Sequence, residues 1–73
     1  MSALQERLLL LKSKTGALQQ QIANAIGVSL RTYQRFEHGE REPTASTIIA
    51  LAKFYGVSAD YLLGLTDNPN PKA

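Results

Sequence analysis

The segment QQQIANAIGVSLRTYQRFEHG, residues 19–39, decides the fold, because it reads as two short helices joined by a tight turn. Ile22, Ala23 and Ile26 recur at helical spacing and predict a first helix over residues 19–26 with one apolar face. The glutamines that open this helix offer hydrogen-bond donors and acceptors in several directions. Such side chains suit the recognition of another molecule, and the rest of the chain has to indicate which one.

The turn between the two helices is Gly27-Val28-Ser29. Gly27 permits a sharp change of direction, Val28 provides an apolar plug, and the Ser29 hydroxyl can accept a backbone N–H at the start of the next helix. We expect Ala23 where the helices come closest, since its small side chain allows a close approach. Two helices joined in this way form a helix-turn-helix.

The second helix of the segment is predicted over residues 30–37, with Tyr33 and Phe36 facing the core. By subtraction, its outer face carries Leu30, Arg31, Thr32, Gln34 and Arg35. Such a helix fits the major groove of B-DNA, where Arg can bond guanine, Gln can bond adenine, and apolar groups can touch the thymine methyl. The alternative is that the two arginines only keep the surface soluble.

The remaining apolar pattern predicts three more short helices and no strand, so the fold class is all-α with five helices. Leu4, Leu8 and Leu11 share one face of a helix that precedes the segment. A fourth helix is predicted over residues 45–55 and a short fifth over residues 59–63. The inward positions expected in the fourth helix are Ala45, Ile48, Leu51, Ala52 and Tyr55.

Length and composition fit one soluble domain of 73 residues, 44% hydrophobic and 19% charged, with no cysteine. A chain this short buries about 60% of its unfolded surface, so packed helices alone must supply the core. The leucine run near the N-terminus is too short and too charged for a membrane segment, which favours a cytoplasmic protein.

Residues 12–41 hold five basic and two acidic residues, a weak indication of a polyanionic partner. The polar, Pro-containing tail, residues 67–73, is expected to be frayed or a linker stub.

Four pieces of the chain together carry a family resemblance: QQQIANAIGVS, RTYQRFEHGEREP, LAKFYGVSADYLLG and the leucine register of the first helix. On these pieces the chain resembles the lambda-repressor-like, Cro-type helix-turn-helix DNA-binding domains of phage repressors and of bacterial regulators of the xenobiotic-response-element type. The resemblance covers about residues 4–66. It implies a compact five-helix domain over residues 1–66 that binds double-stranded DNA, with the helix-turn-helix at the second and third helices.

The resemblance also implies roles for individual residues. Gln19 would touch a backbone phosphate and brace the recognition helix, and the His38-Gly39 turn would approach phosphate; for His38 the alternative is an ordinary exposed turn histidine. Lys12, where the family commonly has Arg, would form a structural pair with Glu37. The implied base-reading residues are Leu30, Arg31, Thr32, Gln34 and Arg35, and the other phosphate contacts are Lys14, Gln20, Ser29 and Arg41.

Two departures from the family pattern affect the expected binding. Leu18 takes the place where the family usually has a Thr or Ser cap, which should cost roughly 1 kcal/mol of helix stability. Glu40 and Glu42 stand in the turn after the recognition helix and should weaken non-specific contact with phosphates. We therefore expect selective, salt-sensitive and modest DNA binding by a single domain.

The function that these features favour is a sequence-specific transcriptional repressor that binds a palindromic operator as a homodimer, because one domain reads about half a site. The candidate dimer contacts are the apolar positions Ile49, Phe54 and Leu65, with Leu9 and Leu10 as a second patch. A second hypothesis is a protein-interaction module, such as an antitoxin or a scaffold. No enzyme, cofactor or metal site is expected, since the chain has one His and no Cys. A sensor or dimerisation domain, absent from these residues, could follow the tail.

Overall fold

The computed structural model describes residues 2–71, and this part of the chain forms helices and no strand, which confirms the all-α prediction. The third helix is one residue longer than predicted and includes His38. The short fifth helix ends one residue earlier than predicted. The elements are α1 (Ala3–Thr15), α2 (Gln19–Ile26), α3 (Leu30–His38), α4 (Ala45–Tyr55) and α5 (Ala59–Leu62).

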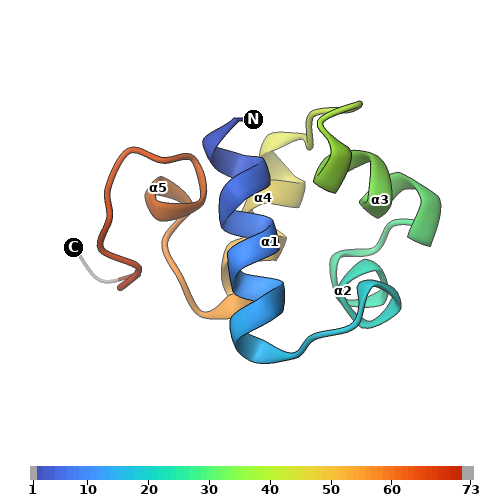
Figure 1. Ribbon diagram of the computed structural model, residues 1–73, viewed down its shortest axis with the longest axis horizontal. Helices are drawn as coiled ribbons and strands as arrows, with labels where there is room; N and C mark the ends of the chain where they lie inside the picture. Colours follow the sequence, from blue (N-terminus) through green and yellow to red (C-terminus); the bar gives the residue numbers. More distant parts are fainter. Residues whose placement is uncertain (1, 72–73) are drawn as a thin grey trace.

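The helices are arranged around α1, which runs through the middle of the molecule (Figure 1). In this view α2 and α3 lie on one side of α1, and α5 with the chain that follows it lies on the other. α2 packs against both α3 and α4, while α1 contacts α3 and α5. The helix-turn-helix therefore rests on two supporting helices, and one flank of it stays open.

Local capping explains where most of the helices begin. Ser2, Ser29, Thr44 and Ser58 each accept a backbone N–H from the first turn of the helix that follows. Leu18 precedes α2 and provides no side-chain cap, as predicted, although its own N–H donates to Gln21 Oε1 at 3.2 Å. At the other end of α2, Gly27 has a φ of 77°, a left-handed conformation that favours glycine.

The core is a single cluster of apolar side chains contributed by all five helices. The expected inward positions of α1 and α2 are buried or half-buried. In α4 the prediction for Ala45 is wrong: Ala45 is exposed, because the buried part of this helix begins one turn later at Ile48. The buried core residues are Leu8, Leu11, Ile22, Ala23, Ile26, Tyr33, Phe36, Ile48, Leu51, Ala52, Val57, Tyr61 and Leu62.

The segment after α5 is hydrogen-bonded to the rest of the domain, whereas residues 67–73 were expected to be frayed or a linker stub. The Ser58 N–H donates to the Pro69 carbonyl at 3.0 Å, and the Arg7 guanidinium donates to the Thr66 carbonyl at 3.2 Å. Hydrogen bonds from α1 and from the start of α5 thus hold the segment in place; the last two residues of the predicted tail lie outside the described part of the chain. None of the helices in residues 2–71 is both long enough and apolar enough to cross a membrane.

Candidate nucleic-acid interface

The helix α3, which the sequence predicts to be the recognition helix, has one face in the core and one face outside. Tyr33 is fully buried and Phe36 is 4% exposed, so the predicted inward orientation of both rings is confirmed. Arg31 is exposed, and the other predicted base-reading side chains, Leu30, Thr32, Gln34 and Arg35, are half-buried. The two aromatic rings therefore anchor the helix from behind while its first two turns stay accessible.

The basic side chains on this surface are free to meet a ligand. Within residues 2–71, neither Arg31 nor Arg35 makes a side-chain hydrogen bond or an ion pair. His38 is exposed in the last turn of α3, and Arg41 is exposed in the turn that follows. Lys14 is exposed in the last turn of α1. Within residues 2–71 no carboxylate lies within ion-pair distance of Lys14, Arg31, Arg35 or Arg41, so these four cations are available to an anionic partner.

Behind the surface, the buried carboxylate of Glu37 joins three helices. Glu37 is 3% exposed and accepts three side-chain hydrogen bonds, from Tyr33 Oη at 2.6 Å, Gln19 Nε2 at 2.8 Å and Lys12 Nζ at 2.9 Å. The structure thus brings Lys12 and Glu37 together as an ion pair. We call these four residues the Glu37 cluster; it ties α1 and α2 to the end of the recognition helix.

The protonation states in the Glu37 cluster follow from burial and hydrogen bonding. Burial alone would raise the pKa of Glu37, but the hydrogen bonds from Tyr33, Lys12 and Gln19 outweigh it and hold the pKa below its ordinary value of 4.5. Burial, reinforced by the Glu37 carboxylate, raises the pKa of Tyr33. At neutral pH the cluster therefore holds a carboxylate anion and a phenol that donates to it.

Gln19 extends the cluster to the surface of α3. Its amide nitrogen donates inward to Glu37, and its amide oxygen accepts a hydrogen bond from Gln34 Nε2 at 3.1 Å. The next residue, Gln20, is exposed and donates to Asn24 Oδ1 at 2.9 Å. Of these two predicted phosphate contacts, Gln19 is built into the interior network and Gln20 stands outside it.

Ser29 and Thr32 are paired with each other at the start of α3. The Ser29 hydroxyl oxygen accepts the Thr32 N–H at 3.1 Å and donates to Thr32 Oγ1 at 3.0 Å. The structure therefore uses Ser29 as the N-cap of the helix. Val28 is half-buried and packs against the core beside this turn.

Sequence reasoning missed Gln5, which holds the far end of the recognition helix. Gln5 Oε1 accepts the Ser2 N–H at 3.0 Å, and Gln5 Nε2 reaches the Glu37 carbonyl at 3.4 Å. Gly39 follows α3 with a φ of 72°, and Gln5 fills the space that a Cβ on Gly39 would occupy. The spacing Ser2-x-x-Gln5 is a capping-box signature that could have indicated the first of these bonds, but not the contact with α3.

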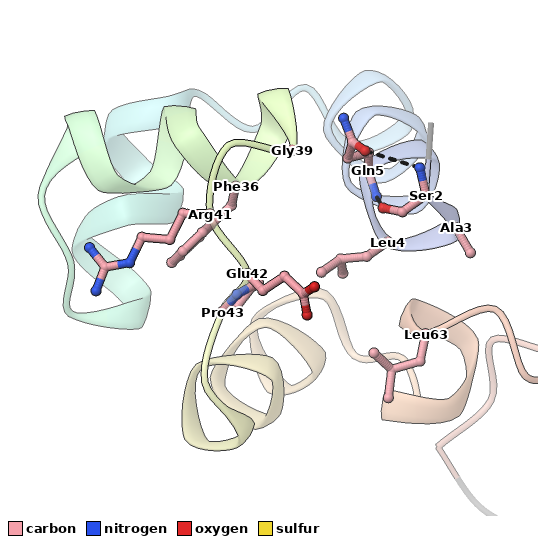
Figure 2. A pocket seen from close by; sticks show the side chains of 10 residues that line it. All are labelled: Ser2, Ala3, Leu4, Gln5, Phe36, Gly39, Arg41, Glu42, Pro43 and Leu63. Atoms are coloured by element: carbon pink, nitrogen blue, oxygen red, sulfur yellow. Dashed lines mark hydrogen bonds between the residues drawn. The ribbon is translucent and has the colours of Figure 1, made fainter.

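A shallow cavity of about 290 Å³ lies beside this contact, between the start of α1 and the turn from α3 to α4. Figure 2 shows Leu4 and Leu63 on its apolar side and the Arg41 guanidinium extending away from them. Arg41 is thus directed toward the side of the molecule that carries α2 and α3.

The fold and this surface together define a helix-turn-helix domain with an accessible recognition helix. Residues 16–62 match the family model for the helix-turn-helix family HTH_3. The chain therefore belongs to this Cro/C1-type helix-turn-helix family, as the sequence resemblance predicted.

Similar proteins of known sequence carry related names. The chain is 37% identical over 67 residues to the uncharacterised HTH-type transcriptional regulator YobD of Bacillus subtilis, covering 92% of this chain and 60% of YobD. It is 36% identical over 58 residues to the SPbeta prophage-derived regulator YonR of the same organism, covering 80% of this chain and 54% of YonR.

A third relative is the cryptic phage CTXphi transcriptional repressor RstR of Vibrio cholerae, 49% identical over 39 residues, which are 53% of this chain and 35% of RstR. The chain thus spans at most 60% of the length of these relatives. No solved structure gives a significant match.

Proposed function

We propose that this domain is a sequence-specific DNA-binding regulator of transcription, and that α3 enters the major groove of double-stranded DNA. The observation that carries the proposal is the accessible start of α3, where Arg31 and Arg35 have no partner in residues 2–71 while Tyr33 and Phe36 fix the helix from behind. The family match and the names of the relatives, which are transcriptional regulators and a repressor, support it.

Each side chain of this surface would contact the kind of base that its chemical groups match. Arg31 and Arg35 can each offer two donors to the O6 and N7 acceptors of guanine. Leu30 and the Thr32 methyl can contact a thymine methyl, and Gln34 can hydrogen-bond a base edge. These five side chains lie on consecutive turns at the start of α3, the part of a recognition helix that reaches base edges in this motif.

Phosphate contacts would surround this surface. Lys14 and Arg41 are exposed cations, and His38 adds an exposed imidazole at the end of α3. Gln20 is exposed in the first turn of α2, and Ser29 is exposed in the turn that precedes α3. Glu40 and Glu42 are exposed beside Arg41, so we expect modest affinity that falls as salt rises.

The regulator would act as a repressor in the cytoplasm, bound as a homodimer to a pseudo-palindromic operator. Ile49 and Leu65 are 51% and 74% exposed and remain candidates for the dimer contact. Phe54 is half-buried and packs edge-on against Tyr55, which makes it the weaker candidate. In the second patch Leu10 is 42% exposed and Leu9 is half-buried.

Selection of binding duplexes from a random pool tests the proposal. A recovered palindrome would give the operator and its symmetry together. Arg31→Ala should then cost about 1–3 kcal/mol on the selected site and relax the preference at one base pair. Lys14→Ala should weaken all duplexes alike and lower the salt slope by about one unit.

The control variant is Lys53→Ala, which removes an exposed lysine from α4, away from the recognition helix. It should leave both the affinity and the base preference unchanged. Recovery of no enriched duplex, or equal affinity of the Arg31→Ala and wild-type proteins for the enriched duplex, would contradict the proposal and favour a protein-interaction module on the same fold.

A further inference from the structure

The buried charge of Glu37 fixes which end of the Gln19 amide faces inward. An ionised carboxylate only accepts hydrogen bonds, and Glu37 is 3% exposed, so water cannot supply a substitute donor. Gln19 must therefore turn its NH₂ group to Glu37, and the structure has Nε2 of Gln19 at 2.8 Å from Oε1 of Glu37. The amide oxygen of Gln19 is then directed to its other neighbour.

That neighbour is Gln34, and its hydrogen bond to Gln19 fixes the orientation of its own side-chain amide. The Gln19 oxygen can only accept, so Gln34 must present its own NH₂ group, and its Nε2 lies 3.1 Å from Gln19 Oε1. One N–H of Gln34 is committed to this bond. The amide oxygen of Gln34 accepts no hydrogen bond from residues 2–71, and the second N–H is likewise free.

We infer that Glu37, acting through Gln19, locks the Gln34 amide in the orientation that reads adenine in the major groove. Adenine presents a donor at N6 and an acceptor at N7, which match the free oxygen and the remaining N–H of Gln34. Guanine presents two acceptors, O6 and N7, and needs two donors. Gln34 can supply two donors only by breaking its bond to Gln19, so the lock discriminates against guanine.

This inference rests on the proposed DNA binding, and it assigns adenine as the base that Gln34 prefers. Gln34 would be the specificity-determining residue, and Gln19 and Glu37 would be positioning residues that touch the base only through it. The neighbouring Gln20 is the matched contrast, since it is exposed and bonded to Asn24 rather than to the buried carboxylate. Nothing in the described chain prevents the Gln20 amide from exchanging its two ends.

The lock can be tested first without DNA, by NMR of the glutamine side-chain amides in ¹⁵N-labelled protein. We expect the amide protons that Gln19 donates to Glu37 and Gln34 donates to Gln19 to exchange with water at least tenfold more slowly than those of Gln20, because the Gln20 amide is exposed and bonds only the exposed Asn24 side chain. In Gln19→Met the Gln34 protons should exchange as fast as those of Gln20. Equal exchange of Gln34 and Gln20 in the wild-type protein would overturn the inference.

The second test is duplex selection with the wild-type protein and with Gln34→Met, Gln19→Met and the control variant Lys53→Ala. The wild-type and Lys53→Ala proteins should select adenine at one position of each half-site, and Gln34→Met should lose that preference. Gln19→Met should still bind, but its preference for adenine over guanine at that position should fall by about tenfold or more. An undiminished preference in Gln19→Met would refute the lock and leave the proposed function standing.

A test on the DNA side avoids any effect of the variants on folding. In the selected site, 2-aminopurine removes the N6 donor of the adenine, and 7-deazaadenine removes the N7 acceptor. Each analogue should weaken binding of the wild-type protein by about tenfold. Equal binding to both analogues and to adenine would refute the inference, whereas failure of the wild-type protein to enrich any duplex would refute the proposed function itself.

Discussion

Two charged side chains, Glu37 and Arg7, each connect distant parts of this molecule. Glu37 does so as a buried hydrogen-bond acceptor, and Arg7 does so as a partly exposed hydrogen-bond donor. Glu37 is 3% exposed, and its side-chain partners come from α1, α2 and α3. Arg7 on α1 is 20% exposed, and it donates to the Tyr61 and Thr66 carbonyls and to the fully exposed carboxylate of Asp67. Its guanidinium also lies 4.0 Å from the centre of the Tyr61 ring. We call Arg7 and its three partners the Arg7 cluster.

The difference teaches where charge stabilises this fold. A buried carboxylate depends on every one of its partners, because water cannot replace a lost donor in the interior. A half-buried guanidinium can exchange some of its partners for water, so each of its bonds contributes less. The Glu37 cluster lies behind the recognition helix, whereas the Arg7 cluster holds only the segment after α5.

The largest expected effect is that of Glu37→Ala. It leaves Tyr33 Oη without an acceptor in the interior and the Lys12 ammonium without its counter-ion, so we expect a loss of about 3 kcal/mol in the free energy of unfolding. Urea denaturation followed by circular dichroism measures it. Glu40→Ala, which removes an exposed carboxylate three residues later, should have no measurable effect; equal losses in the two variants would break the comparison.

The next effect separates two buried tyrosine hydroxyls. Tyr33→Phe removes a donor to the Glu37 carboxylate and should cost about 2 kcal/mol. Tyr55→Phe should be neutral or stabilising, because the Tyr55 hydroxyl is buried without a hydrogen-bond partner in residues 2–71, and this burial raises its pKa to about 12. Thermal denaturation of the pair checks the contrast, and a larger loss in Tyr55→Phe would contradict it.

Acid should weaken the domain through the Glu37 cluster. Because the folded pKa of Glu37 lies below its ordinary value of 4.5, the carboxylate contributes stability that is complete above about pH 4.5 and is lost as pH falls through the folded value. The loss should be smaller than that of Glu37→Ala, because a protonated carboxyl still accepts hydrogen bonds. Unfolding free energies measured from pH 6 downward should fall less steeply in Glu37→Gln than in the wild-type protein.

The smallest effects belong to the Arg7 cluster. Arg7→Ala should cost about 1–2 kcal/mol, since two backbone hydrogen bonds and the contact with the Tyr61 ring are lost together. Asp67→Ala should have no measurable effect, because its carboxylate is fully exposed. Limited proteolysis after α5 should accelerate in Arg7→Ala alone, and faster cleavage in Asp67→Ala would show that the exposed ion pair carries the attachment.

The sequence was sufficient for the helices and for the orientation of α3, because periodic apolar residues report directly on which face is covered. Tyr33 and Phe36 could be placed inside by spacing alone. The partners of Arg7 could not be predicted, since two of them are backbone carbonyls more than 50 residues away, and any residue provides a carbonyl. Ala45 was misplaced because periodicity does not show where the packing surface ends.

In the candidate site, too, some features could be predicted from the sequence and others could not. The list of base-reading residues follows from the exposed face of α3 and remains a prediction. The pair of Lys12 and Glu37 came from family resemblance, and the structure supplies its ion-pair geometry. The bond from Gln34 to Gln19 could not be predicted, because the direction of an amide depends on a buried charge two contacts away.

The contact between Gln5 and Gly39 has an evolutionary consequence. A side chain at position 39 would meet both a left-handed backbone and the Gln5 amide, and Gln5 could withdraw only by giving up its bonds to the Ser2 N–H and the Glu37 carbonyl. A single missense change at codon 39 would therefore disturb the start of α1 as well as the end of α3. Every amino-acid replacement at position 39 thus meets two obstacles at once, although Gly39 itself is exposed at the surface.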